Sequence, residues 1–231
     1  MIGIKYEFIE SDTFVFNGIT LYRIRALQDI PKYNVKAGDL GGYIEKGCLS
    51  QQGNCWVGYN AKVLGNARVF DNALVTDHAV VYGKAMVYGN AKVYGNARVC
   101  EYATVYDDSI VYDHAKIHGS ARIHDTASVH NDAIVYGDAE VYNDAKIYGH
   151  AEVYESAKLF NNAQAFDDAN VHGNAQVYDD AWVFGHCKIY GNAKVFDSAN
   201  VTDDAHVRGV GMVCNHAIVK DHDDISCVTV L

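Results

Sequence analysis

A six-residue alternation of small, polar and aliphatic residues runs through most of the chain. From Val57 to Val219 every sixth residue is Val, Ile or Leu, with Ala165 as the one exception. The residue four places after each aliphatic position is alanine, apart from Ser109, Cys187, Gly211 and Asp223. Two columns that stay in phase over this distance indicate an internal repeat.

Each unit reads Ala-x-Val-aromatic, followed by two turn-forming residues such as Gly89-Asn90. Alternation along a strand places Ala and Val on one side and the polar residue and the ring on the other. Both turn residues are of types that tolerate a left-handed backbone. A four-residue strand and a two-residue corner, repeated three times, close an 18-residue triangular coil. The pattern therefore predicts an all-β, single-stranded parallel β-helix of about nine coils, on the order of 45 Å long.

Residues 1–48 lack this period. Residues 6–9 and 19–24 are predicted to be strands, joined by a hairpin turn at Asn17-Gly18. An uncovered terminal coil would expose an edge that pairs with other chains. We therefore expect a small N-terminal β cap over 1–48 and a hexapeptide-repeat β-solenoid over 49–231, with a partner-binding head as the alternative role for 1–48. Asp223 stands in an alanine position, so the last coil is expected to be open or distorted.

An aromatic column follows the aliphatic residue on one face. Eight successive coils place a ring there, and strand spacing lets such rings stack. The column favours either stacking between coils or an interface with a second copy or a protein partner, since a long apolar stripe is unusual on a monomer. Its members are Phe70, Tyr88, Tyr106, His124, Tyr142, Phe160, Tyr178 and Phe196.

A second column, at one corner, alternates histidine with Asn or Asp every 36 residues. It could form a pH-sensitive or metal-binding ridge. The histidines would lie about 10 Å apart, too far to share one ion, and these residue types also suit a left-handed turn. We therefore predict no metal site. The members of this polar corner are His78, His114, Asp132, His150, Asp168, His186 and Asp204.

Acidic residues collect at two of the three corners, and the formal net charge of the chain is −10. This charge disfavours direct binding to nucleic acid or to an anionic membrane. Acidic corners usually form a solvated edge, although they could also imitate a nucleic-acid backbone. The corners carry, for example, Asp77, Asp113, Asp132, Asp167, Asp168, Asp203 and Asp204 on one side, and Asp71, Asp107, Asp108, Asp125, Asp179, Asp180 and Asp197 on the other.

The repeat resembles the hexapeptide repeat of left-handed β-helix proteins. Residues 87–92, Val-Tyr-Gly-Asn-Ala-Lys, match its aliphatic and small positions and depart from it at Tyr88. More narrowly, the lead-in over 35–44 and 49–57 resembles the YdcK-like β-solenoids of bacteria and phages. The resemblance implies a left-handed coil. It implies little about activity, because members of that family are often described only as transferases without a defined reaction.

The unbroken repeat also bears on catalysis. Hexapeptide acyltransferases carry their catalytic histidine on loops that interrupt the coils, and no such loop interrupts residues 57–219. No catalytic residue can therefore be assigned, and His118, His124 and His130 are expected to face three different sides. The favoured function is a non-catalytic structural or protein-interaction solenoid acting through the aromatic face and acidic corners. The alternatives are an acyl-CoA-dependent transferase with a site between subunits and an acidic inhibitor that mimics nucleic acid.

The remaining expectations concern location and partners. Acidic residues near the N-terminus replace the apolar core of a secretory signal, and no segment is long enough to span a membrane. The six cysteines show no regular framework. We expect a cytoplasmic protein with no cofactor, a protein partner or self-association, and contact with neither nucleic acid nor membrane.

Overall fold

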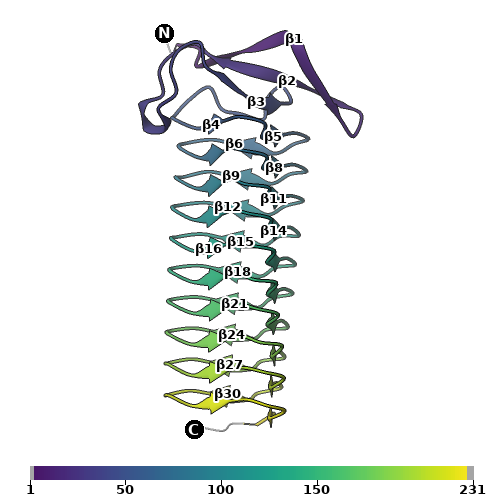
Figure 1. Ribbon diagram of the computed structural model, residues 1–231, viewed down its shortest axis with the longest axis vertical. Helices are drawn as coiled ribbons and strands as arrows, with labels where there is room; N and C mark the ends of the chain where they lie inside the picture. The colour runs from purple at the N-terminus through teal and green to yellow at the C-terminus, as the bar shows by residue number, and fades with distance from the viewer. Residues whose placement is uncertain (1–2, 228–231) are drawn as a thin grey trace.

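The chain winds into a straight rod with a group of longer strands at its N-terminal end (Figure 1). The computed structural model describes residues 3–227. Three parallel sheets run along the rod, and each turn of the chain adds one short strand to each sheet. The fold is an all-β parallel solenoid, as the repeat predicted, with about ten coils where about nine were expected. Residues that pair in neighbouring coils are 18 positions apart in the sequence, such as Lys92 and Ile110.

The first sheet has 13 strands and includes the N-terminal part of the chain. Its strands are β1 (Tyr6–Phe16), β2 (Ile19–Ala26), β3 (Leu40–Ile44), β5 (Lys62–Val63), β8 (Val80–Val81), β11 (Arg98–Val99), β14 (Lys116–Ile117), β17 (Ile134–Val135), β20 (Glu152–Val153), β23 (Asn170–Val171), β26 (Lys188–Ile189), β29 (His206–Val207) and β32 (Asp224–Ile225).

The other two sheets lie entirely in the solenoid. The ten-stranded sheet comprises β4 (Trp56–Val57), β7 (Leu74–Val75), β10 (Lys92–Val93), β13 (Ile110–Val111), β16 (Ser128–Val129), β19 (Lys146–Ile147), β22 (Gln164–Ala165), β25 (Trp182–Val183), β28 (Asn200–Val201) and β31 (Ile218–Val219). The nine-stranded sheet comprises β6 (Arg68–Val69), β9 (Met86–Val87), β12 (Thr104–Val105), β15 (Arg122–Ile123), β18 (Glu140–Val141), β21 (Lys158–Leu159), β24 (Gln176–Val177), β27 (Lys194–Val195) and β30 (Met212–Val213).

The strands are two residues long, shorter than the four that the alternation predicted. The reason lies at the corners, where the alanine N–H donates to the carbonyl of the preceding aromatic residue, as from Ala73 to Phe70 at 3.2 Å. These two residues are therefore the ends of a β-turn. Hydrogen bonds between coils continue through the corner, for example from the Asn90 N–H to the Asp107 carbonyl at 2.7 Å. Neighbouring coils are thus joined along almost their whole length.

Only the first of the two turn residues has a left-handed backbone. The expectation that this backbone explains both turn columns is therefore corrected. Gly89 has φ 67° and Asp107 has φ 56°, whereas the residues that follow them are not in the positive-φ region. A positive φ at the first central position alone is typical of a type II′ turn, which Gly, Asn and Asp tolerate best. The preference for a left-handed backbone thus explains the first turn column and not the second.

Alanine and the aliphatic residue fill the interior, as predicted. Nearly every member of both columns is buried, including Ala165 in the aliphatic column and Cys187 in the alanine column. Ser109 is polar but is also buried in the alanine column, and its hydroxyl donates to the Tyr106 carbonyl at 2.7 Å. The polar residue of each strand faces outward. The core is therefore a continuous stack of small apolar side chains along the rod.

The N-terminal strands extend one face of the rod. The antiparallel pair β1 and β2 meets at the predicted Asn17-Gly18 turn, where both residues have positive φ. The first strand runs further than expected, with an irregularity between Ile9 and Thr13. Strand β3 pairs antiparallel with β2 and parallel with β5, so cap and solenoid share one sheet. A single 3-10 turn (Pro31–Tyr33) lies between β2 and β3.

The C-terminal coil is open at Asp223, whose side chain is exposed although it stands in an alanine position. This agrees with the expectation for that residue. The end of the proposed 49–231 unit, residues 228–231, lies outside the described part of the chain. The division at residue 48 stays a prediction, as does the left-handed sense of the coil. Among residues 3–227 no helix has the length and apolar content needed to cross a membrane.

Candidate functional site on the solenoid surface

The predicted aromatic column forms a stack of parallel rings, here called the first ladder. Neighbouring ring centroids lie 4.8 to 5.1 Å apart, with interplanar angles of 1° to 9°. Each ring is half-buried because its two faces are covered by its neighbours. Only ring edges therefore reach solvent, which makes this stripe less apolar than an exposed aromatic surface. It runs through Phe70, Tyr88, Tyr106, His124, Tyr142, Phe160, Tyr178 and Phe196.

Two further ladders, which were not predicted from the sequence, occupy the other corners. The signal was present, because the residue after the aliphatic position is an aromatic or histidine ring in most coils on all three sides, although Leu64, Thr76 and Cys100 show that the column is not continuous. The second ladder is Tyr94, Tyr112, His130, Tyr148, Phe166 and Phe184. The third is His118, Tyr136, Tyr154, His172 and Tyr190. Stacked rings therefore occur on all three sides of the rod, and a ladder by itself does not mark one side for binding.

The polar corner is solvent-exposed and makes few contacts. The His186 Nδ1 lies 3.6 Å from an Asp168 carboxylate oxygen, and the His114 ring nitrogen lies 3.4 Å from the Asn96 amide. Within residues 3–227, no three potential metal ligands come together at this corner. Its residues occupy the second turn position, where φ is not positive. The proposed left-handed explanation for this column is wrong, and its functional role stays a prediction.

The acidic corners are used structurally. A carboxylate at the first turn position accepts the backbone N–H of the equivalent residue in the next coil. Examples are Asp77 with the Gly95 N–H at 3.0 Å and Asp125 with the Asn143 N–H at 3.1 Å. Hydrogen bonds to a carboxylate are stronger than those between neutral groups. The acidic residues therefore fasten one corner to the next, in addition to keeping the edge solvated.

A shallow polar groove of about 570 Å³ follows the corner beside the first ladder. Side-chain amides and carboxylates line it in register, so that the Asn161 amide donates to Asp179 and the Asn162 amide to Asp180, at 2.8 and 2.9 Å. The groove runs over four coils and ends near Asp125. It presents a row of oxygen acceptors to any partner that approaches this corner.

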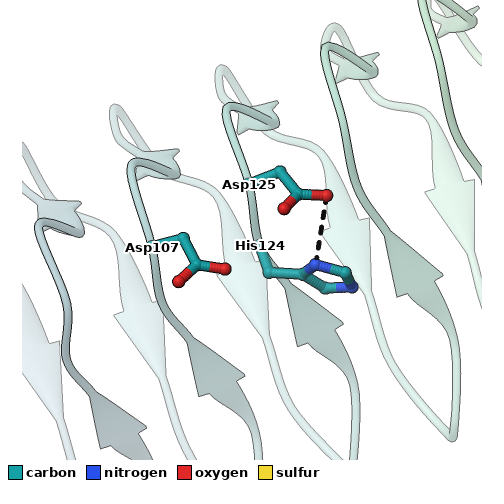
Figure 2. A group of neighbouring side chains, drawn as sticks. All are labelled: Asp107, His124 and Asp125. Carbon is teal, nitrogen blue, oxygen red and sulfur yellow. Dashed lines mark ion pairs between the residues drawn. The ribbon is translucent and has the colours of Figure 1, made fainter.

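One imidazole in the first ladder lies between two carboxylates. His124 is stacked between Tyr106 and Tyr142, at 4.8 and 5.1 Å, and its Nδ1 faces an Asp125 oxygen at 3.4 Å (Figure 2). Asp107 extends toward the same place from the preceding coil. One ligand atom from each of Asp107, His124 and Asp125 lies within 4.8 Å of the other two. The sequence alone did not bring these three residues together, because one carboxylate is the chain neighbour of His124 and the other lies almost a full coil earlier in the chain.

The opposite edge of the same imidazole faces a charged network. The His124 Nε2 lies 3.6 Å from Glu140, which accepts a hydrogen bond from Lys158 at 2.8 Å and lies 3.4 Å from Arg122. Burial raises the pKa of Glu140, but the bond from Lys158 and the nearby cations outweigh it, so the pKa lies below its usual value. Glu140 is therefore held as a carboxylate beside the ring.

A cleft of about 450 Å³ lies where the cap meets the first coils, a feature that the repeat could not predict. Burial raises the pKa of Tyr33 in its wall to about 12, and the hydroxyl donates to the Asn72 carbonyl. The two carboxylates that line it are already engaged, Asp39 by the Lys36 N–H and Asp77 by the Gly95 N–H. Both carboxylates of the cleft thus already take part in backbone hydrogen bonds.

The three histidines of one coil are separated, as expected. His118 stacks in the third ladder, His124 in the first and His130 in the second. They cannot act on one substrate within a single chain.

Comparison with known proteins bears on the repeat alone. The family model described as the YdcK beta solenoid repeat matches residues 67–83. No curated protein matches the chain significantly. The matched segment spans nearly one coil, and the same register continues through the coils that follow. The resemblance noted from the sequence is confirmed in this form: the chain is a β-solenoid that carries the YdcK beta solenoid repeat.

Proposed function

We propose that this chain is a non-catalytic interaction rod, which binds a basic protein surface along the first ladder and the acidic corner beside it. The observation that carries the proposal is the unbroken register of the coils. Every solenoid strand pairs with the equivalent residues one coil away, with no inserted loop between β4 and β31. Enzyme sites require a concave, water-shielded place, which regular coils do not supply.

The distribution of charge supports a basic partner. Carboxylates concentrate at the corners, whereas many Lys and Arg residues occupy the centres of the flat faces, such as Lys92, Lys116 and Lys146. A partner that lies along a corner would therefore meet a stripe of one sign, edged by tyrosine hydroxyls of the first ladder. Complementary charge steers association and fixes its orientation.

Capture from a lysate of the native host, with charge-neutralised variants, tests this proposal. The variant carries Asp108→Asn, Asp144→Asn and Asp180→Asn, which are second turn positions beside the first ladder. The matched control carries Asp132→Asn, Asp168→Asn and Asp204→Asn at the polar corner. The partner should be retained by the control, lost by the first variant and released by salt, since exposed charge pairs are screened.

Two outcomes would contradict the proposal. One is a partner that both variants capture equally and that salt does not release. The other is saturable calorimetric binding of acetyl-CoA to the wild-type chain, which would favour the acyltransferase alternative instead.

A further inference from the structure

We propose that Asp107, His124 and Asp125 form a binding site for a divalent transition-metal ion, with Zn²⁺ as the best fit. Zinc in proteins is bound by histidine nitrogen and by Asp or Glu oxygen, often with three protein ligands and one open position. The three side chains supply one nitrogen and two carboxylates, which together would balance the charge of a divalent ion. The site joins two successive coils, since Asp107 follows β12 and the other two residues follow β15.

The first pair of ligands already has the required spacing. Two ligands about 2.1 Å from one tetrahedral ion lie about 3.4 Å apart. The His124 Nδ1 and the Asp125 oxygen are 3.4 Å apart. The Asp107 oxygen lies within 4.8 Å of both atoms, and this side chain is exposed, so a change of its rotamer can bring it closer.

The imidazole is oriented in advance. Its ring is held between Tyr106 and Tyr142, which fixes the plane in which Nδ1 points. The other nitrogen, Nε2, faces the Glu140 carboxylate at 3.6 Å. A metal-binding histidine commonly directs its second nitrogen at a carboxylate, which fixes the tautomer and makes the first nitrogen a better ligand. The buried Nε2 makes no hydrogen bond in this structure, and the Glu140 carboxylate beside it, held by Lys158 and Arg122, is the group placed to accept one after a small shift.

The other ladder histidines provide an internal comparison. Each imidazole lies near the first turn residue of its own coil and that of the preceding coil. Around His130 these are Asn131 and Asp113, whereas His118 and His172 each have one glutamate and one glycine. Only His124 in the described ladders has a carboxylate on both sides, and only its surroundings bring three potential ligands together within residues 3–227. The site is therefore a local departure from the repeat.

Zinc titration of the full chain by isothermal calorimetry, with cobalt absorption as a spectroscopic reading, tests the site. His124→Phe is the main variant, because Phe160 shows that phenylalanine stacks in this ladder. Asp107→Asn removes one ligand from an exposed side chain. His130→Phe is the matched control, since it removes an imidazole from another ladder and leaves the proposed ligands in place.

The wild-type chain and His130→Phe should bind one Zn²⁺ with the same affinity at this site. His124→Phe should lower that affinity at least a hundredfold and Asp107→Asn about tenfold, while circular dichroism of the metal-free variants stays unchanged. The Nδ1 resonance of His124 should shift on zinc addition. Equal affinity in wild type and His124→Phe would overturn the proposal, as would no binding by wild type at millimolar zinc or a shift confined to other histidines.

Discussion

A buried lysine closes the upper end of the rod. Lys5 is fully excluded from solvent, and its Nζ donates to the Cys55 carbonyl at 2.8 Å. The carbonyls of Gln52 and Gly53 accept at 3.3 and 3.4 Å. Elsewhere along the rod such carbonyls accept backbone N–H groups of the preceding coil, but no coil precedes the first one. The ammonium takes the place of the missing coil, in line with the rule that buried polar groups are paired.

We predict that Lys5→Met lowers the free energy of unfolding of the cap by about 1–3 kcal/mol, because it leaves the buried Cys55 carbonyl without its donor. Guanidinium titration, followed by fluorescence of the buried Trp56 in a Trp182→Phe background, measures this. Lys46→Met is the control, since Lys46 forms an exposed ion pair with Glu10, and it should have little effect. Equal midpoints for the two variants would contradict the role assigned to Lys5.

A second residue-scale prediction concerns His130. Burial lowers its pKa below the ordinary 6.5, against smaller opposing effects from Asn131 and Asp113. The folded state thus binds a proton less readily than the unfolded state, so this residue reduces stability as pH falls below about 6.5. His130→Phe should therefore gain stability relative to wild type at pH 5 compared with pH 8. Thermal unfolding at both pH values measures the difference, and a constant difference would refute the argument.

At the scale of the element, each coil has a fixed interior volume that three aliphatic residues share. Most coils place Val or Ile at all three positions, but one coil combines Leu159 with Ala165, both fully buried. A larger and a smaller side chain in one layer preserve the packing density that protein interiors require. The larger Leu159 thus partly offsets the smaller Ala165 in the same coil.

This compensation predicts a non-additive pair. Ala165→Val alone should cost about 1–3 kcal/mol through overpacking, and Leu159→Val alone about 1 kcal/mol through lost contacts. The double variant recreates the composition of a common coil, so it should cost less than the sum of the two single changes. Chemical unfolding of all four proteins measures the coupling. Strict additivity would show that the two side chains do not share a layer.

At the scale of the whole molecule, stability depends on the repeat staying in register from one coil to the next. Each strand residue pairs with its equivalent in the neighbouring coil in all three sheets. A rod built in this way tolerates the removal of whole coils, because the coils on either side of the deletion present matching edges. It should not tolerate the deletion of only part of a coil, because exterior residues would then occupy interior positions.

Deletion of residues 145–162 should therefore leave a folded rod, shorter by about 5 Å. Deletion of residues 145–153 is the control, since it brings Tyr154 into the interior position of Ala145 and should unfold the coils beyond it. Small-angle X-ray scattering gives the length, and circular dichroism gives the strand content. Comparable folding of the two deletions would show that the phase of the repeat does not hold the rod together.

The sequence by itself was sufficient to predict the coil and the residues that fill its interior. Column after column of Val and Ala fixes which side chains face inward, and an unbroken period fixes which residues become neighbours. Non-local pairing is usually hidden in a sequence, but here it follows from counting one coil length forward along the chain. The first ladder was predictable for the same reason, since Phe70 and Tyr88 are one period apart.

Only the tertiary structure decided the contacts that break the period. Lys5 reaches Cys55 because the cap folds over the first coil, a relation that no repeat encodes. The left-handed backbone falls on Asp107 and not on the residue after it, since the turn is closed by hydrogen bonds between fixed partners. His124 meets two carboxylates because the stacked ring and the turn of the preceding coil converge at one corner. Such placement depends on side-chain direction across coils, which the order of residues along the chain does not specify.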